Sequence, residues 1–67
     1  MRPFGERLKE LRTEQGLSTK ALGKIIGVSD MAISRWENCK TDITSDHLVD
    51  LAKYFKVTTD YLLGLED

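Results

Sequence analysis

The stretch LSTKALGKIIGVSDMAISRWE, residues 17–37, decides the fold of this chain. It holds two short amphipathic segments, Thr19–Ile26 and Asp30–Glu37, on either side of Gly27. Isolated helices below about 12 residues are marginal in water, so each segment must be held by packing. Gly23 permits a close approach of the second helix, and Gly27 supplies the positive φ that a sharp turn often requires. The stretch therefore predicts two steeply crossed helices, a helix-turn-helix at about residues 18–37.

Helical spacing of apolar residues extends over most of the remaining chain. It predicts a first helix over Phe4–Gln15, a fourth from Thr44 or Ser45 through Phe55, and a last short helix over Thr59–Leu63. The residues predicted to face inward within the helix-turn-helix are Leu22, Ile26, Val28, Ile33 and Trp36. Strand-like alternation of useful length is absent from the sequence. We therefore predict an all-α fold, a compact five-helix domain in which residues 1–67 form a single domain.

Length and composition exclude several classes of protein. With 67 residues the chain forms one small domain, which buries only about 60% of the surface of its unfolded chain. Its single cysteine, Cys39, excludes an internal disulfide and fits a reducing compartment. Together with the single histidine, His47, it falls short of the four ligands of a zinc site. A catalytic pocket is hard to house beside the core, so we predict a non-enzymatic protein without metal or cofactor.

Hydropathy and charge bear on location and partners. No apolar run approaches the roughly 18–20 residues of a membrane span, and the N-terminus lacks the apolar stretch of a signal peptide, which predicts a cytoplasmic protein. Residues 1–40 carry eight basic and five acidic residues, a net charge of +3, whereas residues 41–67 carry two and six, a net charge of −4. This asymmetry suits a polyanion bound on one side, although a mixed soluble surface explains it equally well.

Three blocks of sequence resemble the Cro/repressor family of helix-turn-helix regulators, which includes the lambdoid phage repressors. The blocks are RLKELR (residues 7–12), the stretch of residues 17–37, and LAKYFKVTTDYLLG (residues 51–64). The resemblance implies a lambda-repressor-like fold and a cytoplasmic regulator associated with the bacterial nucleoid. It also implies sequence-specific binding of double-stranded DNA by a homodimer on a palindromic operator, with the helix from Ser29 to Glu37 in the major groove.

Five residues of this helix lie opposite the inward-facing ones and are predicted to read base edges: Ser29, Asp30, Met31, Ser34 and Arg35. A guanidinium pairs with the O6 and N7 atoms of guanine, so Arg35 is the first candidate. Met31 suits contact with a thymine methyl group. For Asp30 two roles stay open, accepting a hydrogen bond from cytosine N4 or favouring the positive end of its own helix. Ser29 is also a candidate N-cap.

Residues around the predicted recognition helix are expected to contact phosphates, which position a protein without reading sequence. They are Thr19, Lys20, Asn38, Lys40 and Thr41. Thr19 and Lys20 begin the preceding helix, where backbone N–H groups and a cation attract a phosphate. Family members often have glutamine at the position of Thr19, so the usual side-chain contact is in doubt there. Asp42 weakens the patch formed by the loop residues.

The resemblance implies two structural features as well. The pair that matches Arg12 and Glu37 forms a partly buried salt bridge in related phage repressors, and we expect the same bridge here. Lys56 occupies the position where the family commonly has the glycine that ends the fourth helix. A left-handed backbone at Lys56 is expected to cost about 1 kcal/mol.

The sequence therefore predicts a transcriptional regulator of phage or prophage type, a repressor that occupies its operator and excludes polymerase. Half-sites about one helical turn apart are expected for a dimer. The contact between the two copies of the dimer is predicted in the C-terminal region. More apolar residues gather there than one small core can bury: Tyr61, Leu62, Leu63 and Leu65. A second interpretation is that these residues seal the core. The alternative function is a protein-interaction or antitoxin-like module with the same fold.

Overall fold

The computed structural model describes residues 4–38 and 43–65, which form five helices and no strand. The helices are α1 (Phe4–Glu14), α2 (Thr19–Ile26), α3 (Asp30–Glu37), α4 (Ser45–Phe55) and α5 (Thr59–Leu62). The predicted all-α fold is confirmed, with α1 and α5 each one residue shorter than expected. Within the described residues, no helix is long and apolar enough to cross a membrane.

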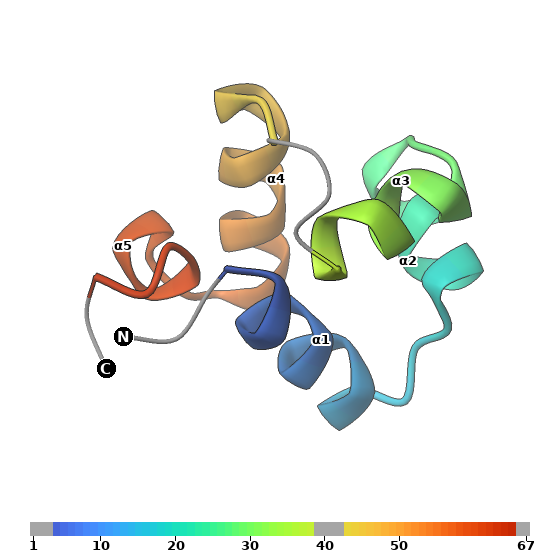
Figure 1. The fold of residues 1–67 in the computed structure, drawn as a ribbon, viewed down its shortest axis with the longest axis horizontal. Helices are drawn as coiled ribbons and strands as arrows, with labels where there is room; N and C mark the ends of the chain where they lie inside the picture. The colour runs from blue at the N-terminus through green and yellow to red at the C-terminus, as the bar shows by residue number, and fades with distance from the viewer. Residues whose placement is uncertain (1–3, 39–42, 66–67) are drawn as a thin grey trace.

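The two helices of the helix-turn-helix lie together at one end of the molecule (Figure 1). The most extensive contact between helices joins α2 and α3, and α1 packs against α3. At the other end, α5 packs against α4 and α1. The longest axis of the molecule measures 27 Å, and α3 and α5 lie toward its opposite ends. They therefore present two separate surfaces to solvent.

Hydroxyl side chains begin four of the helices in the described chain. Ser18 and Ser29 each accept a hydrogen bond through Oγ from the backbone N–H three residues later, at 3.0 and 3.1 Å. Thr44 and Thr58 cap α4 and α5 in the same way. Each bond satisfies an N–H group that has no partner inside its own helix. These caps explain why the helices start where they do.

One apolar core receives side chains from all the helices described. Its buried members are Leu8, Leu22, Ile33, Trp36, Leu51, Ala52, Phe55 and Leu62. Three of the five residues predicted to face inward in the helix-turn-helix belong to it, and the other two, Ile26 and Val28, pack against it partly buried. Because α2 and α3 are too short to be stable alone, this shared core holds them in place.

The turn between α2 and α3 depends on two glycines, as predicted. A Cβ atom on Gly23 would lie 2.7 Å from the carbonyl oxygen of Val28 and 3.2 Å from the carbonyl carbon of Ser29. The chain can approach α2 this closely only because Gly23 has no side chain. Gly27 adopts φ 89° at the end of α2, in the left-handed region that favours glycine. The angle at which α3 leaves α2 is therefore set by the sequence of the turn.

Lys56 ends α4 with a left-handed backbone, at φ 58° and ψ 43°. Among the described residues it is the only one other than glycine with a positive φ. Glycine adopts this conformation without the steric conflict of a Cβ atom, so Lys56→Gly is expected to raise the free energy of unfolding by about 1 kcal/mol. Urea denaturation followed by circular dichroism measures the change.

The matched control is Lys53→Gly, an exposed position in the last turn of the same helix. Glycine inside a helix is expected to lower the free energy of unfolding by up to about 1 kcal/mol there. A Lys56→Gly protein that is no more stable than the parent would contradict the assignment of strain to this residue.

Candidate nucleic-acid interface

α3 has a buried face and an outward face. Ile33 is fully buried and Trp36 is 6% exposed, so this side of the helix belongs to the core. The residues predicted to read bases are all exposed: Ser29, Asp30, Met31, Ser34 and Arg35. Met31 is 62% exposed although its side chain is apolar. The structure thus gathers these five residues on the surface of one helix and its cap, where a partner can reach them.

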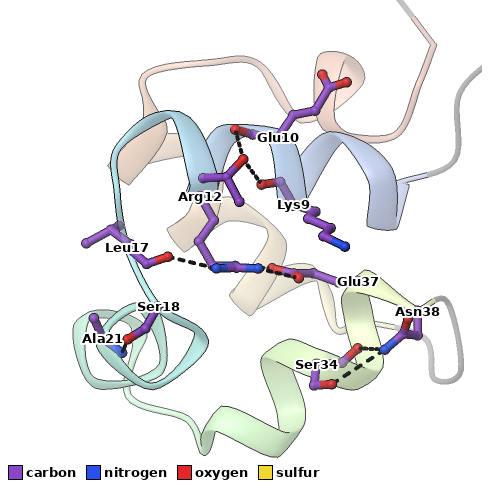
Figure 2. Close-up of polar contacts among 10 residues, drawn as sticks. Lys9, Glu10, Arg12, Leu17, Ser18, Ala21, Ser34, Glu37 and Asn38 are labelled. Atoms are coloured by element: carbon purple, nitrogen blue, oxygen red, sulfur yellow. Dashed lines mark hydrogen bonds and ion pairs between the residues drawn. The ribbon is translucent and has the colours of Figure 1, made fainter.

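Two of the predicted contact residues are bonded to each other (Figure 2). Asn38 Nδ2 donates a hydrogen bond to the carbonyl oxygen of Ser34 at 2.9 Å and lies 3.5 Å from Ser34 Oγ. The backbone N–H of Asn38 donates to the same carbonyl at 3.0 Å. Asn38 therefore caps the C-terminal end of α3, and its phosphate contact stays a prediction. The other two loop residues of the predicted phosphate patch, Lys40 and Thr41, lie outside the described residues.

The start of α2 presents a cation beside a helix N-terminus. Lys20 is exposed, whereas Thr19 is half-buried. Lys24, which the sequence interpretation did not single out, is exposed one turn further along the same helix. Residues four apart lie on the same side of a helix, so the two ammonium groups give α2 a positive outer side. Phosphate contacts by Thr19 and Lys20 stay predictions.

A two-point ion pair ties α1 to the end of α3 (Figure 2). Arg12 Nε donates to Glu37 Oε2 at 2.5 Å, and Arg12 Nη2 donates to Glu37 Oε1 at 3.0 Å. The Arg12 and Glu37 side chains are 12% and 6% exposed. The predicted bridge is therefore present and largely buried. Arg12 Nη1 also donates to the carbonyl oxygen of Leu17 at 2.7 Å, a contact that was not predicted and that fixes the segment leading into α2.

The ion pair keeps Arg12 charged. The hydrogen bond to Glu37 is the main cause that raises the pKa of Arg12 above its ordinary value, against a smaller opposing effect of burial. A raised pKa in the folded state contributes stability at every pH below the ordinary pKa of arginine, and that contribution disappears only as the pH rises through the raised value. The Arg12 side of the bridge is therefore intact at neutral pH.

At Gly5 the backbone of α1 lies close to the backbone of α3. A Cβ atom on Gly5 would lie 2.7 Å from the carbonyl oxygen of Trp36 and 2.7 Å from the carbonyl carbon of Glu37. The first turn of α1 thus packs directly on the backbone of the last turn of α3. Nothing in the local pattern of the sequence indicates this contact, because it joins residues more than 30 positions apart.

Arg7 has a different role from the one that its charge suggests. The sequence interpretation counted it with the basic N-terminal portion, but it is 6% exposed. Its guanidinium carbon lies 4.3 Å from the centre of the Tyr61 ring, a cation–π contact between α1 and α5. Arg7 therefore links two helices inside the domain and does not belong to a surface that attracts a polyanion.

His47, the single histidine, packs beside α3. Its ring centroid lies 5.4 Å from that of Trp36, with the ring planes tilted by 44°. Its Nδ1 atom lies 3.1 Å from Thr44 Oγ1, the N-cap of α4. Across residues 4–38 and 43–65, no group of three or more His, Cys, Asp or Glu side chains is arranged to hold a metal ion. The contacts of His47 are those of a packing residue at the junction of α3 and α4.

The sequence of this chain matches a known protein family. A family model described as helix-turn-helix matches residues 8–62, which include α2, α3 and all eight buried residues of the core. The chain belongs to the helix-turn-helix family. The family resemblance drawn from the three sequence blocks is therefore confirmed, and α3 is the second helix of the motif.

Relatives of this helix-turn-helix domain include a repressor and an activator. Repressor protein C2 of Salmonella phage P22 is 41% identical over 60 residues, which cover 90% of this chain and 28% of the repressor. The HTH-type transcriptional activator BcrR of Enterococcus faecalis is 39% identical over 64 residues, which cover 96% of this chain and 31% of the activator. The chain thus spans less than a third of the length of these two relatives.

A solved structure matches the helix-turn-helix domain closely. The crystal structure of the P22 c2 repressor protein in complex with synthetic operator 9T has a TM-score of 0.91 and 36% sequence identity to this chain. The match covers 98% of this chain and 100% of that one. The arrangement of helices described above is therefore similar to that of a repressor solved in complex with an operator.

The α5 end of the helix-turn-helix domain carries exposed apolar side chains. Leu62 is fully buried and closes the core, as one of the two interpretations of the C-terminal residues required. Leu63 is 39% exposed and Leu65 is 62% exposed, as the other required. On α4, Tyr54 is 36% exposed. The C-terminal region therefore seals the core and also leaves apolar surface uncovered.

Proposed function

We propose that this chain is the sequence-specific, double-stranded DNA-binding domain of a transcriptional regulator, with residues 1–67 forming that single domain. One observation carries the proposal: α3 has its buried side in the core while all five predicted base-reading residues face solvent. The high similarity to the P22 c2 repressor, solved in complex with an operator, supports the same function.

In this mechanism α3 enters the major groove and its outward residues meet base edges. Arg35 pairs with guanine, and Lys20 at the start of α2 neutralises a phosphate. Regulation follows from occupancy, since a protein bound at an operator excludes polymerase from the same DNA. The resemblance to P22 repressor protein C2 supports a phage or prophage-type repressor. The mechanism requires neither covalent chemistry nor a cofactor, and its place is the bacterial nucleoid in the cytoplasm.

We propose that the domain binds a palindromic operator as a homodimer joined at the α5 end. Leu63 and Leu65 supply exposed apolar surface there, and closed two-fold pairs are the commonest oligomers. Two copies that meet at this end hold their α3 helices at most about twice 27 Å apart. Half-sites one helical turn apart are separated by about 34–36 Å, which is within this greatest distance between the two α3 helices.

Selection of bound duplexes from a random DNA pool tests the proposal. The expected result is a palindrome whose half-sites are about 10 base pairs apart, bound at least roughly a thousandfold more tightly than a scrambled duplex at about 50–100 mM salt. Folded protein that enriches no sequence would contradict the DNA-binding function. That outcome would favour the protein-interaction module, for which the exposed Leu63 and Leu65 side chains are the specific observation.

A further inference from the structure

The side chain of Asn38 is bonded to the outward residue Ser34 across the last turn of α3 (Figure 2). Asn38 Nδ2 lies 2.9 Å from the carbonyl oxygen of Ser34 and 3.5 Å from Ser34 Oγ. A carbonyl oxygen only accepts hydrogen bonds, so the amide atom that faces it must be the nitrogen and not the oxygen. That nitrogen carries two hydrogens, and the second is available to Ser34 Oγ. The backbone carbonyl thus fixes which end of the amide faces the Ser34 side chain.

This contact decides how the Ser34 hydroxyl group can bond to a partner. A serine hydroxyl can donate one hydrogen bond and accept two, so by itself it meets either a donor or an acceptor on a base. Facing Asn38 Nδ2, however, Ser34 Oγ is the acceptor, and its own hydrogen points away from the amide. In the described part of the chain, Ser34 Oγ makes no other hydrogen bond. Its hydrogen is therefore available to a partner on the exposed side of α3.

Resting on the proposed DNA-binding function, we infer that Asn38 is a positioning residue that makes the Ser34 hydroxyl a hydrogen-bond donor toward DNA. In the major groove guanine and thymine present acceptors, whereas cytosine presents the N4 amino group, which is a donor. A hydroxyl that only donates bonds to the acceptors and leaves the cytosine N4–H without a partner. Ser34 therefore selects against cytosine at one position of each half-site. Adenine presents both a donor and an acceptor and is tolerated there.

The test compares uracil with cytosine at each position of the selected operator, in both half-sites together. Both bases lack the 5-methyl group, and in the major groove they differ by the O4 acceptor and the N4 donor. Ser34→Ala removes the hydroxyl, so the position that Ser34 contacts is the one where this variant loses the preference of the parent protein. There the parent is expected to bind the uracil operator at least about fivefold more tightly per half-site, the effect of one unpaired polar group. Fluorescence anisotropy titrations measure these ratios.

Asn38→Asp is expected to reverse this preference. The carboxylate that replaces the amide only accepts hydrogen bonds, so the Ser34 hydroxyl donates to it and turns the lone pairs of Oγ toward the DNA. Cytosine should then be bound at least about fivefold more tightly than uracil at the same position. A merely structural loss of the helix cap, or the added negative charge, weakens binding to both operators by one factor and leaves their ratio unchanged.

Two further variants serve as controls. In Asn38→Ala the backbone N–H of residue 38 still donates to the Ser34 carbonyl, as it does at 3.0 Å in the parent, so the end of α3 is expected to persist. The hydroxyl is then free to rotate, and the ratio between the two operators should fall below about twofold. Gln15→Glu makes the same change from amide to carboxylate at an exposed residue after α1 and should keep the ratio of the parent. Circular dichroism melting checks that every variant is folded.

The outcomes separate this role of Asn38 from the proposed function. If selection enriches no sequence, both are overturned. If a specific operator is found and Ser34→Ala changes the preference at no position, the role of Asn38 is overturned and the DNA-binding function stands. The same holds if Asn38→Asp keeps the preference for uracil or binds both operators equally. An inverted preference in Asn38→Asp, at the position that Ser34→Ala identifies and with Gln15→Glu unchanged, establishes the role.

Discussion

Glu37→Ala is expected to destabilise the domain by about 3–5 kcal/mol, because it leaves the Arg12 guanidinium largely buried and without its carboxylate. A domain of 67 residues has a total stability of only about 3–10 kcal/mol. The variant is therefore expected to be partly or wholly unfolded at 25 °C. Urea denaturation and the loss of a cooperative thermal transition measure the effect.

Two further variants show whether burial causes this loss. Glu14→Ala removes an exposed carboxylate from α1 and is expected to change stability by less than about 0.5 kcal/mol. The double variant Arg12→Met with Glu37→Leu replaces the pair by apolar side chains and is expected to recover much of the lost stability. If Glu37→Ala costs less than about 1 kcal/mol, the bridge behaves as an exposed ion pair and the expectation is wrong.

Arg35→Ala is expected to weaken binding to the selected operator by about 5- to 150-fold, the range of one bidentate contact to guanine. Binding to scrambled DNA should fall much less, so the variant loses sequence preference. Replacing the contacted guanine by 7-deazaguanine removes its N7 acceptor. The same replacement should weaken DNA binding by the parent protein and leave DNA binding by Arg35→Ala nearly unchanged. Titrations at fixed salt concentration measure the affinities of both proteins for the operator, the scrambled duplex and the 7-deazaguanine operator.

Lys20→Ala is the matched control for Arg35→Ala, since both residues are exposed cations on the helix-turn-helix. A phosphate contact carries no sequence information, so Lys20→Ala should weaken binding to operator and scrambled DNA by the same factor. It should also reduce the slope of log K against log salt by about one. Equal, salt-independent losses in the two variants would contradict this division between base reading and phosphate contact.

The local features of the fold were predictable from sequence, because short-range rules govern them. Ser29 at the start of α3 and Gly23 at the crossing of α2 and α3 follow from the demands of one cap and one close approach. The left-handed Lys56 was expected only through the family resemblance. The alternation of inward and outward positions on α3 follows from helical periodicity. These rules suffice to place the predicted base-reading residues on the outward side.

Contacts between segments that are distant in the sequence were harder to predict from the sequence. The Arg12–Glu37 bridge was expected through family resemblance, whereas the contact of Gly5 with the end of α3 and that of Arg7 with Tyr61 carry no local signal. Each depends on how α1 lies against the other helices. The Asn38 cap is different: an amide four residues after a serine at a helix end is a local pattern that sequence reasoning overlooked.

The separation between the two sides of α3 has an evolutionary consequence. Asp30, Met31 and Arg35 are exposed and are not members of the core, so their replacement is expected to change stability by only about 0.5 kcal/mol or less. If these residues read bases as proposed, mutations at them alter the preferred DNA sequence while the scaffold persists. A lineage built on this chain can acquire new binding preferences one substitution at a time without passing through unfolded intermediates, and a designer can retarget it by the same route.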